Sequence, residues 1–475
     1  MTQTPLFPIH LEHTVRELMK LMAAGSSPAI RSREFIFHGS RGVLLYHGYY
    51  SDQNKLETHV LRPIQEAHAI QLQDTIPILA MHPSISLEEV KQALLQGHCA
   101  ILLQGSAVIW LADLSVQPES VLTEPQNEQV VRGSQEGFND DIDSNIQSIH
   151  KRLSAEQLRI QTLQLGKKNK TQVSILYVDS LAQPSVVQAI ADKLNQFPGD
   201  YVKSPGQVSD SLETSPWSLF PQMLYTERVD TCVSHLMEGK VIVFINGSNS
   251  ALVLPVTFYM FYEAADDATA RWWNGTFFRI LRLSSSLITL ALPAIYIAIV
   301  SFHYEVLPID IVFSLKASLE NIPFDPLLEA LFMMMVLELL REAALRLPKP
   351  IAPTLSIVGG LVIGTEVVRA NLVSTTMIVV ISLTAVASFS LPSNEMRNAY
   401  RLVSFPLLFA AAMLGFPGIV LGFSLLLMHL CKLETYGVPY FYPAAPLKVG
   451  KLLQAFIQLP SHFLKNRQWL RREDE

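Results

Sequence analysis

The chain has 475 residues, of which 49% are hydrophobic and only 16% are charged, against about 25% charged in a typical soluble domain. The deficit is uneven, because segments 283–303 and 371–393 contain no formal charge. The net charge of −6 gives no support for nucleic-acid binding, since the nearest basic group, Lys167, Lys168 and Lys170, is small and typical of a solvated loop.

The three cysteines, Cys99, Cys232 and Cys431, are far apart in the sequence. Their spacing predicts neither a metal site nor a disulfide framework, and it fits a reducing compartment. The first ten residues, MTQTPLFPIH, lack the basic region and apolar run of a cleaved signal peptide. We therefore expect the front half to be cytoplasmic.

The front half repeats one pattern of a strand, two helices and an apolar hairpin. In the first copy the predicted elements are a strand at 42–48, a helix at 54–61 that is ended or kinked by Pro63, and a helix at 87–96. In the second copy they are a strand at 172–180 and helices at 185–194 and 229–238.

Each copy ends in two apolar runs that flank a glycine, at 97–113 and at 239–255. Gly105 and Gly247 supply the positive φ angle that a hairpin turn requires. Two such units predict two related subdomains, with chance similarity of two helix–hairpin units as the alternative.

The predicted fold is an α/β soluble N-terminal region of two related subdomains, followed by an α-helical polytopic membrane domain. The predicted limits are a helical lead-in at 1–30, α/β subdomains at 31–123 and 154–258, a polar connector and helix at 124–153, a membrane domain at 259–433, and a basic cytoplasmic tail at 434–475.

Enzyme signatures are missing from the sequence: it contains no GxGxxG, GxxxxGK[ST], GxSxG or HExxH motif. His10 and His13 have no evident third ligand. The acidic group Asp140, Asp141 and Asp143 lacks the spacing of a calcium loop. We predict no catalytic residue, cofactor or metal.

Two polar groups in the front half are expected to serve helix ends. Asp140 or Asp141 is expected to cap a helix at 142–153. The run Thr226-Glu227-Arg228 is interpreted as the N-terminus of the helix that follows it.

The second half contains several segments long enough to cross a bilayer. Residues 283–303 would span about 30 Å as a helix, the thickness of the hydrocarbon core. Residues 371–393 are equally uncharged, and 351–368 are apolar until Glu366. Residues 402–430 are either one broken helix or a hairpin of two short helices. Pro406 and the sequence Gly-Phe-Pro-Gly at 415–418 interrupt this segment.

The segment 325–348 is ambiguous because it carries five charges past Pro326, and each costs roughly 2.5–3.5 kcal/mol at a bilayer centre. Such a helix can cross only if its charged side faces protein or water. Basic residues flank the whole region on both sides, which predicts an even number of crossings with both ends inside. Four crossings would place Arg341 and Arg401 outside, whereas six place them inside, so the charges favour six.

One segment, SIVGGLVIGTEVV, has two contrasting faces. Ser356, Gly360 and Gly364 recur every four residues and form a small-residue face for close helix packing. On roughly the opposite face, Val358, Val362 and Glu366 have the same spacing and are candidates to line a pore, as an apolar gate and an acidic ring. The alternative is a lipid-facing valine stripe with Glu366 reaching the membrane surface.

Several stretches together make the chain resemble the A subunit of the GerA-type germinant receptors of endospore-forming bacteria. They are EPQNEQVVRGSQEGF (124–138), SLFPQMLYTERVD (218–230), EGKVIVFINGSNSALVLPVTF (238–258), NGTFFRILR (274–282), LREAALRLPKPI (340–351), SIVGGLVIGTEVVRANLVS (356–374), LTAVASFSLP (383–392) and YGVPYFYPAAP (436–446). The resemblance covers nearly the whole chain. Ser134 and Gln135 replace the Pro and Arg usual in the family, Asn246 replaces an Asp, and Ala352 replaces a Gly.

The resemblance implies a multi-pass subunit in the inner membrane of the spore, with its N-terminal domain in the cytoplasm. It implies a transporter-like B subunit that binds the nutrient, a lipoprotein C subunit, and a homo-oligomeric ring that forms an ion channel. It also strengthens the pore interpretation of Val358, Val362 and Glu366. The rival functions are a secondary transporter, which needs broken helices in two inverted halves, and a non-conducting scaffold.

Overall fold

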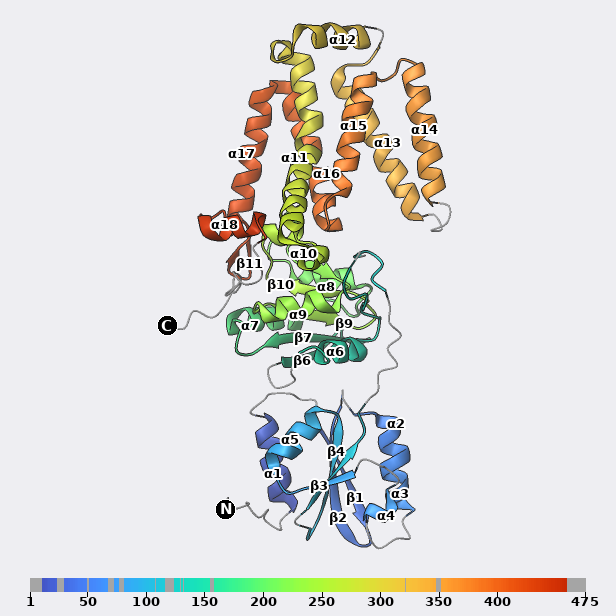
Figure 1. Ribbon diagram of the computed structural model, residues 1–475, viewed down its shortest axis with the longest axis vertical. Coiled ribbons are helices and arrows are strands. Elements are labelled where there is room, and N and C mark those ends of the chain that lie inside the picture. Colours follow the sequence, from blue (N-terminus) through green and yellow to red (C-terminus); the bar gives the residue numbers. More distant parts are fainter. Residues whose placement is uncertain are drawn as a thin grey trace.

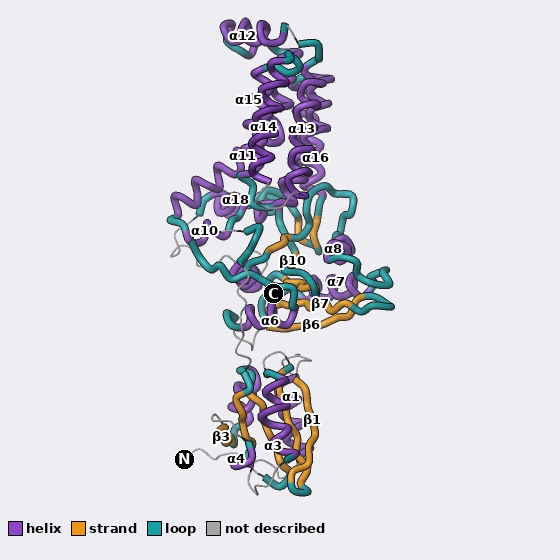
Figure 2. Tube along the Cα trace, turned by 90° about the vertical axis from the view of Figure 1, so that its right-hand side faces the viewer, coloured by secondary structure: helices purple, strands orange, loops and turns teal. Residues whose placement is uncertain are grey.

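The computed structural model describes residues 11–458 apart from 24–29, 49–50, 67–71, 77–80, 107, 116–123, 129, 131, 154–157, 321 and 347–351. The molecule is elongated, with two α/β units and a helical bundle stacked along its long axis (Figures 1 and 2). The sheets therefore lie at one end and the apolar helices at the other.

The first unit is a five-stranded antiparallel sheet in the order β1-β2-β4-β5-β3. Its strands are β1 (Ile30–Phe37), β2 (Ser40–His47), β3 (Met81–Ser84), β4 (His98–Leu103) and β5 (Ile109–Asp113). One face is covered by α1 (Leu11–Ala23) and α5 (Leu87–Leu95). The other is covered by α2 (Gln53–Lys55), a π-helix (Leu56–Leu61), α3 (Arg62–Gln65) and α4 (Leu72–Thr75).

Pro63 does not end the helix predicted at 54–61. The helical path runs from Gln53 to Gln65, with the π-helical turn directly before the proline. The N–H of Arg62 bonds to the carbonyl of Glu57, five residues back, so the backbone widens where the proline lacks a donor.

The second unit repeats this topology, in the order β6-β7-β9-β10-β8. Its strands are β6 (Leu158–Leu165), β7 (Thr171–Val178), β8 (Leu224–Thr226), β9 (Val241–Ile245) and β10 (Ala251–Leu254), and its helices are α6 (Ile142–His150), α7 (Pro184–Asn195), α8 (Pro205–Leu212) and α9 (Val229–Met237). Alternation along β9 sends Ile242 and Phe244 to the α6–α9 side and Val243 to the α7–α8 side. The central strand is therefore apolar on both faces.

Both predicted hairpins are confirmed, and so are the helices predicted at 87–96 and 229–238. The turns are wider than a two-residue loop: β9 ends at Ile245 and β10 begins at Ala251, with Gly247 at a φ of +82°. Asp141 caps α6 by accepting a hydrogen bond from the N–H of Ser144. The domain limits drawn from the sequence stay predictions.

The second half is a bundle of helices. After a 3₁₀ turn (Phe258–Tyr262) and α10 (Ala265–Thr269), its elements are α11 (Trp272–Phe302), a second 3₁₀ turn (Tyr304–Val306), α12 (Ile309–Leu319), α13 (Pro326–Arg346), α14 (Ala352–Arg369), α15 (Thr375–Phe389), α16 (Asn394–Leu414) and α17 (Phe416–Lys432). Gly415, at a φ of +66°, separates α16 from α17, and the two helices pack side by side as a hairpin (Figure 1). Of the two alternatives for 402–430, the hairpin is the one observed.

By length and composition, α11 is the one described helix that is long and apolar enough to cross a membrane. The helices α15 and α17 are apolar but shorter. The chain then forms a small ribbon of β11 (Glu434–Thr435) and β12 (Val438–Pro439), and ends its described part with α18 (Val449–Phe456). The number of membrane crossings stays a prediction.

Candidate functional site

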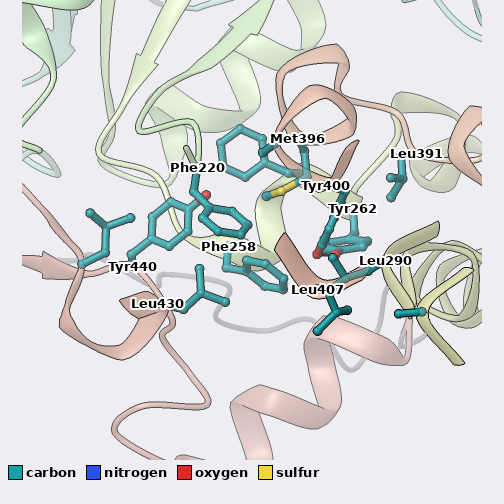
Figure 3. Packing of buried hydrophobic residues seen from close by; sticks show 14 of the residues in the cluster. Phe220, Phe258, Tyr262, Leu290, Leu391, Met396, Tyr400, Leu407, Leu430 and Tyr440 are labelled. Atoms are coloured by element: carbon teal, nitrogen blue, oxygen red, sulfur yellow. Dashed lines mark hydrogen bonds between the residues drawn. The ribbon is translucent and has the colours of Figure 1, made fainter. Parts of the chain in front are cut away.

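The second sheet unit and the bundle are joined by a cluster of buried aromatic residues (Figure 3). Phe220 precedes β8, Phe258 follows β10, Tyr400 comes from α16 and Tyr440 follows β12. The N–H of Phe258 donates to the carbonyl of Tyr440 at 2.7 Å, and the hydroxyls of Tyr262 and Tyr400 are hydrogen-bonded to each other. Segments far apart in the sequence are therefore fixed against one another.

An ion network ties α10 to the start of α11. The Asp267 carboxylate, 3% exposed, accepts hydrogen bonds from Arg279 Nε at 3.2 Å and from both terminal nitrogens of Arg282 at 2.8 and 2.9 Å. Arg282 also donates to the carbonyl of Tyr262. Charges buried this deeply are stable only when paired, so the network holds the first turns of α11 in one orientation.

A second set of contacts fastens the polar connector to the second sheet unit. The Glu227 carboxylate accepts hydrogen bonds from the N–H groups of Gln126 and Asn127 and from the Asn127 side-chain amide, at 2.6–3.2 Å. In return, Glu128 accepts from the N–H of Glu227 and from the hydroxyl of Thr226. Burial raises the pKa of the Glu128 carboxyl. We call these reciprocal contacts of Glu227 and Glu128 the connector clamp.

Arg228 completes the connector clamp. Its guanidinium is 2% exposed, pairs with Asp230 at 2.7 Å and donates to the carbonyls of Glu128 and Ser134. The run Thr226-Glu227-Arg228 directly precedes α9, which starts at Val229, as the sequence predicted, but Arg228 at the N-cap position makes no side-chain capping hydrogen bond and Thr226 is the last residue of β8. The sequence did not predict the contacts that these residues make with the polar connector. Two features of the sequence could have indicated these contacts: the charged pair Glu227-Arg228 beside an apolar strand, and the polar run EPQNE in the connector.

A cavity of about 630 Å³ lies between the connector clamp, the Asp267 network and the α15–α16 turn. Carboxylates outnumber guanidinium groups in its lining: the acidic, basic and histidine residues are Glu128, Glu227, Asp230, Glu238, Glu263, Asp266, Asp267, Glu395, His235, Arg228, Arg279 and Arg282. Among the described residues no group of three His, Cys, Asp or Glu side chains could hold a metal ion. The cavity is therefore a polar space at the junction between the second sheet unit and the helical bundle.

Behind this cavity, Lys240 donates to Glu238 at 2.7 Å and to His235 Nδ1 at 3.1 Å. Burial opposes ionisation of Glu238, but the Lys240 ammonium and the contact with His235 together outweigh it and lower the pKa of that carboxyl. Burial, with Lys240 nearby, lowers the pKa of His235, whose Nδ1 also lies 3.2 Å from the Glu238 carboxylate. The group is a satisfied structural network.

The predicted pore-lining residues lie on α14, at the edge of the bundle beside α13 (Figure 1). Val362 is 51% exposed, and Glu366 pairs with Arg369 at 2.9 Å on an exposed face. The side chains of Val358 and Ser356 lie outside the described residues. Arg369 was not among the predicted residues, and it sets a cation beside the predicted acidic position.

The predicted small-residue face of α14 has no partner within the described chain. A Cβ added at Gly360 or Gly364 would meet no heavy atom within 4 Å. The glycine that faces a neighbour is Gly359, where an added Cβ would lie 3.2 Å from Leu340 Cδ2. Val367 is buried against the bundle, so the packed face is the one through Gly359 and Val367.

The charges of α13 explain how this helix fits into the bundle. Glu329 is 0% exposed and accepts hydrogen bonds from the N–H and hydroxyl of Ser374, which caps α15. Glu338 is shared between Arg341 at 2.9 Å and Arg401 at 2.7 Å. Glu329, Glu338 and Arg341 thus face protein, whereas Glu342 and Arg346 pair with each other on an exposed surface at the end of the helix.

The sequence profile of the family described as Bacillus/Clostridium GerA spore germination protein matches residues 17–470. Spore germination protein GerLA of Bacillus cereus is 32% identical over 98% of this chain and 97% of its own length. Spore germination protein A1 of Bacillus subtilis is 33% identical over 89% of each chain.

A Bacillus subtilis relative described as uncharacterized membrane protein YfkQ is 33% identical over 94% of this chain and 88% of its own. Among solved structures, the N-terminal domain of the A subunit of the Bacillus megaterium spore germinant receptor GerK3 aligns with 54% of this chain and 99% of that chain, at 15% identity and a TM-score of 0.37. The family assignment rests on the sequence matches.

Proposed function

The chain belongs to the GerA spore germination protein family, and on that premise we propose that it is the A subunit of a nutrient germinant receptor whose copies assemble into a ligand-gated cation channel. Its role in germination follows from the family. The channel, the ring and the pore residues Val358, Val362 and Glu366 are the proposal.

We place α11 and α13 to α17 across the inner membrane of the spore as six crossings, with the sheet units in the cytoplasm. Support comes from charge: Arg341, Arg397 and Arg401 lie at the bundle end that faces the second sheet unit, as positive-inside topology requires. The partners are a transporter-like B subunit that binds the nutrient and a lipoprotein C subunit.

The observation that carries the channel proposal is the exposure of α14. Among the described side chains of α14, the face through Gly359 and Val367 packs on its own chain, while Val362 of the valine face and the positions Gly360 and Gly364 are open. Two open flanks on opposite sides are what a helix needs to contact one copy on each side in a ring. Small residues on one flank permit the close approach.

Gating follows from the same geometry. Nutrient binding by the B subunit shifts an equilibrium between closed and open rings, and the shift equals the difference in its affinity for the two states. The ion network at Asp267 and the connector clamp transmit movement of the cytoplasmic unit to α11. Valine side chains close the pore by dewetting, and Glu366 attracts cations at its outer mouth.

The test is conductance of the purified full chain in a planar bilayer. Val362→Ala should widen the apolar gate and give ion leak without nutrient, measured as current and as spontaneous germination of spores. Val379→Ala is the matched control, because Val379 is 66% exposed on α15 and is not a proposed gate residue. A Val362→Ala protein that assembles normally and has wild-type permeability contradicts the pore assignment.

The charge beside the gate sharpens the test. Arg369→Gln removes the cation paired with Glu366 and should increase preference for cations over anions, whereas Glu366→Gln should reduce it. Reversal potentials in asymmetric salt measure both. A secondary transporter would instead show saturable, substrate-coupled flux in liposomes, and a scaffold would show neither.

A further inference from the structure

Three arginines from two helices converge at the end of the bundle that faces the second sheet unit. Arg341 belongs to α13, whereas Arg397 and Arg401 belong to the first turns of α16. Phe389, the last residue of α15, lies between two of them, with its ring 5.6 Å from the Arg341 guanidinium carbon and 5.7 Å from that of Arg397. Two of the like charges thus flank one aromatic ring, and Arg401 is linked to Arg341 through Glu338, to which both are paired.

The negative charge nearby is too small to balance them. Glu338 is the one carboxylate of the described residues that forms ion pairs with this group, and it is shared by Arg341 and Arg401. Arg397 donates to the carbonyl of Leu391 at 2.8 Å and forms no ion pair with a described carboxylate. Glu395, two residues before Arg397, adds a second carboxylate that is hydrogen-bonded to Ser393, so three guanidinium groups against two carboxylates still leave an excess of positive charge.

Hydrogen-bond donors are also left over. The Nε atoms of Arg397 and Arg401 are buried and have no hydrogen-bond partner among the described residues. A guanidinium presents its five N–H groups as a planar fork, which matches two oxygens of a phosphate. Unused donors on partly buried arginines point to an absent acceptor with several oxygens.

The surroundings indicate where that acceptor comes from. Large apolar side chains beside the arginines are exposed: Leu339 is 62%, Val386 is 66% and Phe389 is 62% exposed. In the six-crossing arrangement this surface meets acyl chains, and the arginines lie at headgroup depth on the cytoplasmic side. Basic pockets between membrane helices at that depth bind anionic lipid headgroups.

We propose that Arg341, Arg397 and Arg401 form a binding site for the phosphate of an anionic phospholipid of the cytoplasmic leaflet, with Phe389 against its glycerol and upper acyl region. The inference rests on the proposed membrane placement of the bundle but not on channel activity. Because the site joins α13 to α16 next to the α15–α16 turn that lines the junction cavity, a bound lipid stabilises that joint.

The test uses the full chain in neutral detergent, titrated with phosphatidylglycerol or with phosphatidylcholine, with bound lipid counted by native mass spectrometry. Phosphatidylglycerol should bind preferentially to the wild type, and Arg397→Gln/Arg401→Gln should weaken its binding about 10- to 30-fold, from about fivefold for each cation removed. Arg346→Gln is the control, because Arg346 is 78% exposed and already paired with Glu342.

A second variant predicts the opposite sign. Glu338→Gln removes the shared carboxylate and should strengthen phosphatidylglycerol binding by about fivefold, so a folding defect alone cannot imitate the result. Glycerol phosphate and inorganic phosphate test the source of the ligand. If either competes at the concentration at which the lipid binds, the site is a free-phosphate site and the lipid proposal is wrong.

Equal binding of both lipids by a folded wild type, or unchanged phosphatidylglycerol binding in the Arg397→Gln/Arg401→Gln variant, would overturn the inference. The outcome is separable from the proposed function, since the channel proposal is tested by conductance. A chain that does not enter lipid vesicles at all would instead refute the membrane placement.

Discussion

Compared with helix α14, the ion network at the junction between the second sheet unit and the bundle is shielded from solvent: Asp267 is 3% and Arg279 is 4% exposed, and both have hydrogen-bond partners from the same chain. On α14, Leu361 is 65% and Val362 is 51% exposed. Both regions contain stretches that the family resemblance singles out. They differ in how much of their surface the same chain covers.

The difference in exposure predicts different consequences of substitution in the two regions. Groups of the junction are satisfied within one chain, so substitutions there should change the stability of the isolated protein. Groups of α14 have few partners within the chain, so substitutions there should change assembly or conduction and leave the stability nearly unaltered.

The largest effect is expected for Asp267→Asn, which leaves Arg282 buried without its charged partner and Arg279 with only the longer pair to Glu263 at 3.8 Å. Loss of one member of a buried ion network costs about 3–5 kcal/mol. Unfolding can be followed by thiol labelling of Cys232, which is buried, in a background where Cys99 is replaced by Ala and the exposed Cys431 by Ser. Glu342→Gln, in the exposed pair with Arg346, should change stability by less than about 1 kcal/mol.

A smaller effect is expected for Glu227→Gln in the connector clamp. Hydrogen bonds to a charged group contribute about 1.5–3 kcal/mol, and the amide that replaces one oxygen would oppose N–H donors of Gln126 and Asn127. The connector at 124–138 should then open more often, measured as faster limited proteolysis at that segment. Gln135→Ala, at an exposed position of the same connector, should leave the cleavage rate unchanged.

Acidification should destabilise the sheet units through buried histidines. Burial lowers the pKa of His47 to about 3, with His150 adding to the effect, and burial lowers the pKa of His150 to about 4, from an ordinary value of 6.5. The unfolded chain therefore binds protons that the folded chain excludes. Stability is fully present above pH 6.5 and is lost as the pH falls toward 4, by about 1.4 kcal/mol per pH unit for each histidine.

Denaturant unfolding between pH 7 and pH 5 measures this slope. His150→Gln should remove about half of it, with little change at pH 7.5. A stability that is flat with pH in both proteins would contradict the burial of these side chains.

The smallest effect on stability is expected on α14. Leu361→Ala should change the free energy of unfolding by no more than about 0.5 kcal/mol, as at other exposed positions. Leu408→Ala, at a position that is 0% exposed on α16, should cost about 2–5 kcal/mol. If the two variants are equally destabilised in detergent, α14 is packed within its own chain and the comparison with the junction fails.

Local pattern predicted much of the framework. The hairpins at 97–113 and 239–255, the cap at Asp141 and the break at Gly415 all follow from a few neighbouring residues, through apolar period, side-chain capping and positive φ. Strands β1 and β6 were missed, because each carries several polar residues and so lacks the dense apolar runs of β4 and β9.

Tertiary structure decided the rest. Glu227 meets Asn127 across 100 residues, and Asp267 meets Gln458 across 191, so no local periodicity could pair them. The sequence also singled out Gly360 and Gly364 as a packing face, but the glycine that meets a neighbour within the chain is Gly359. Spacing determines which residues share a face of a helix, whereas the direction in which that face points depends on everything packed around it.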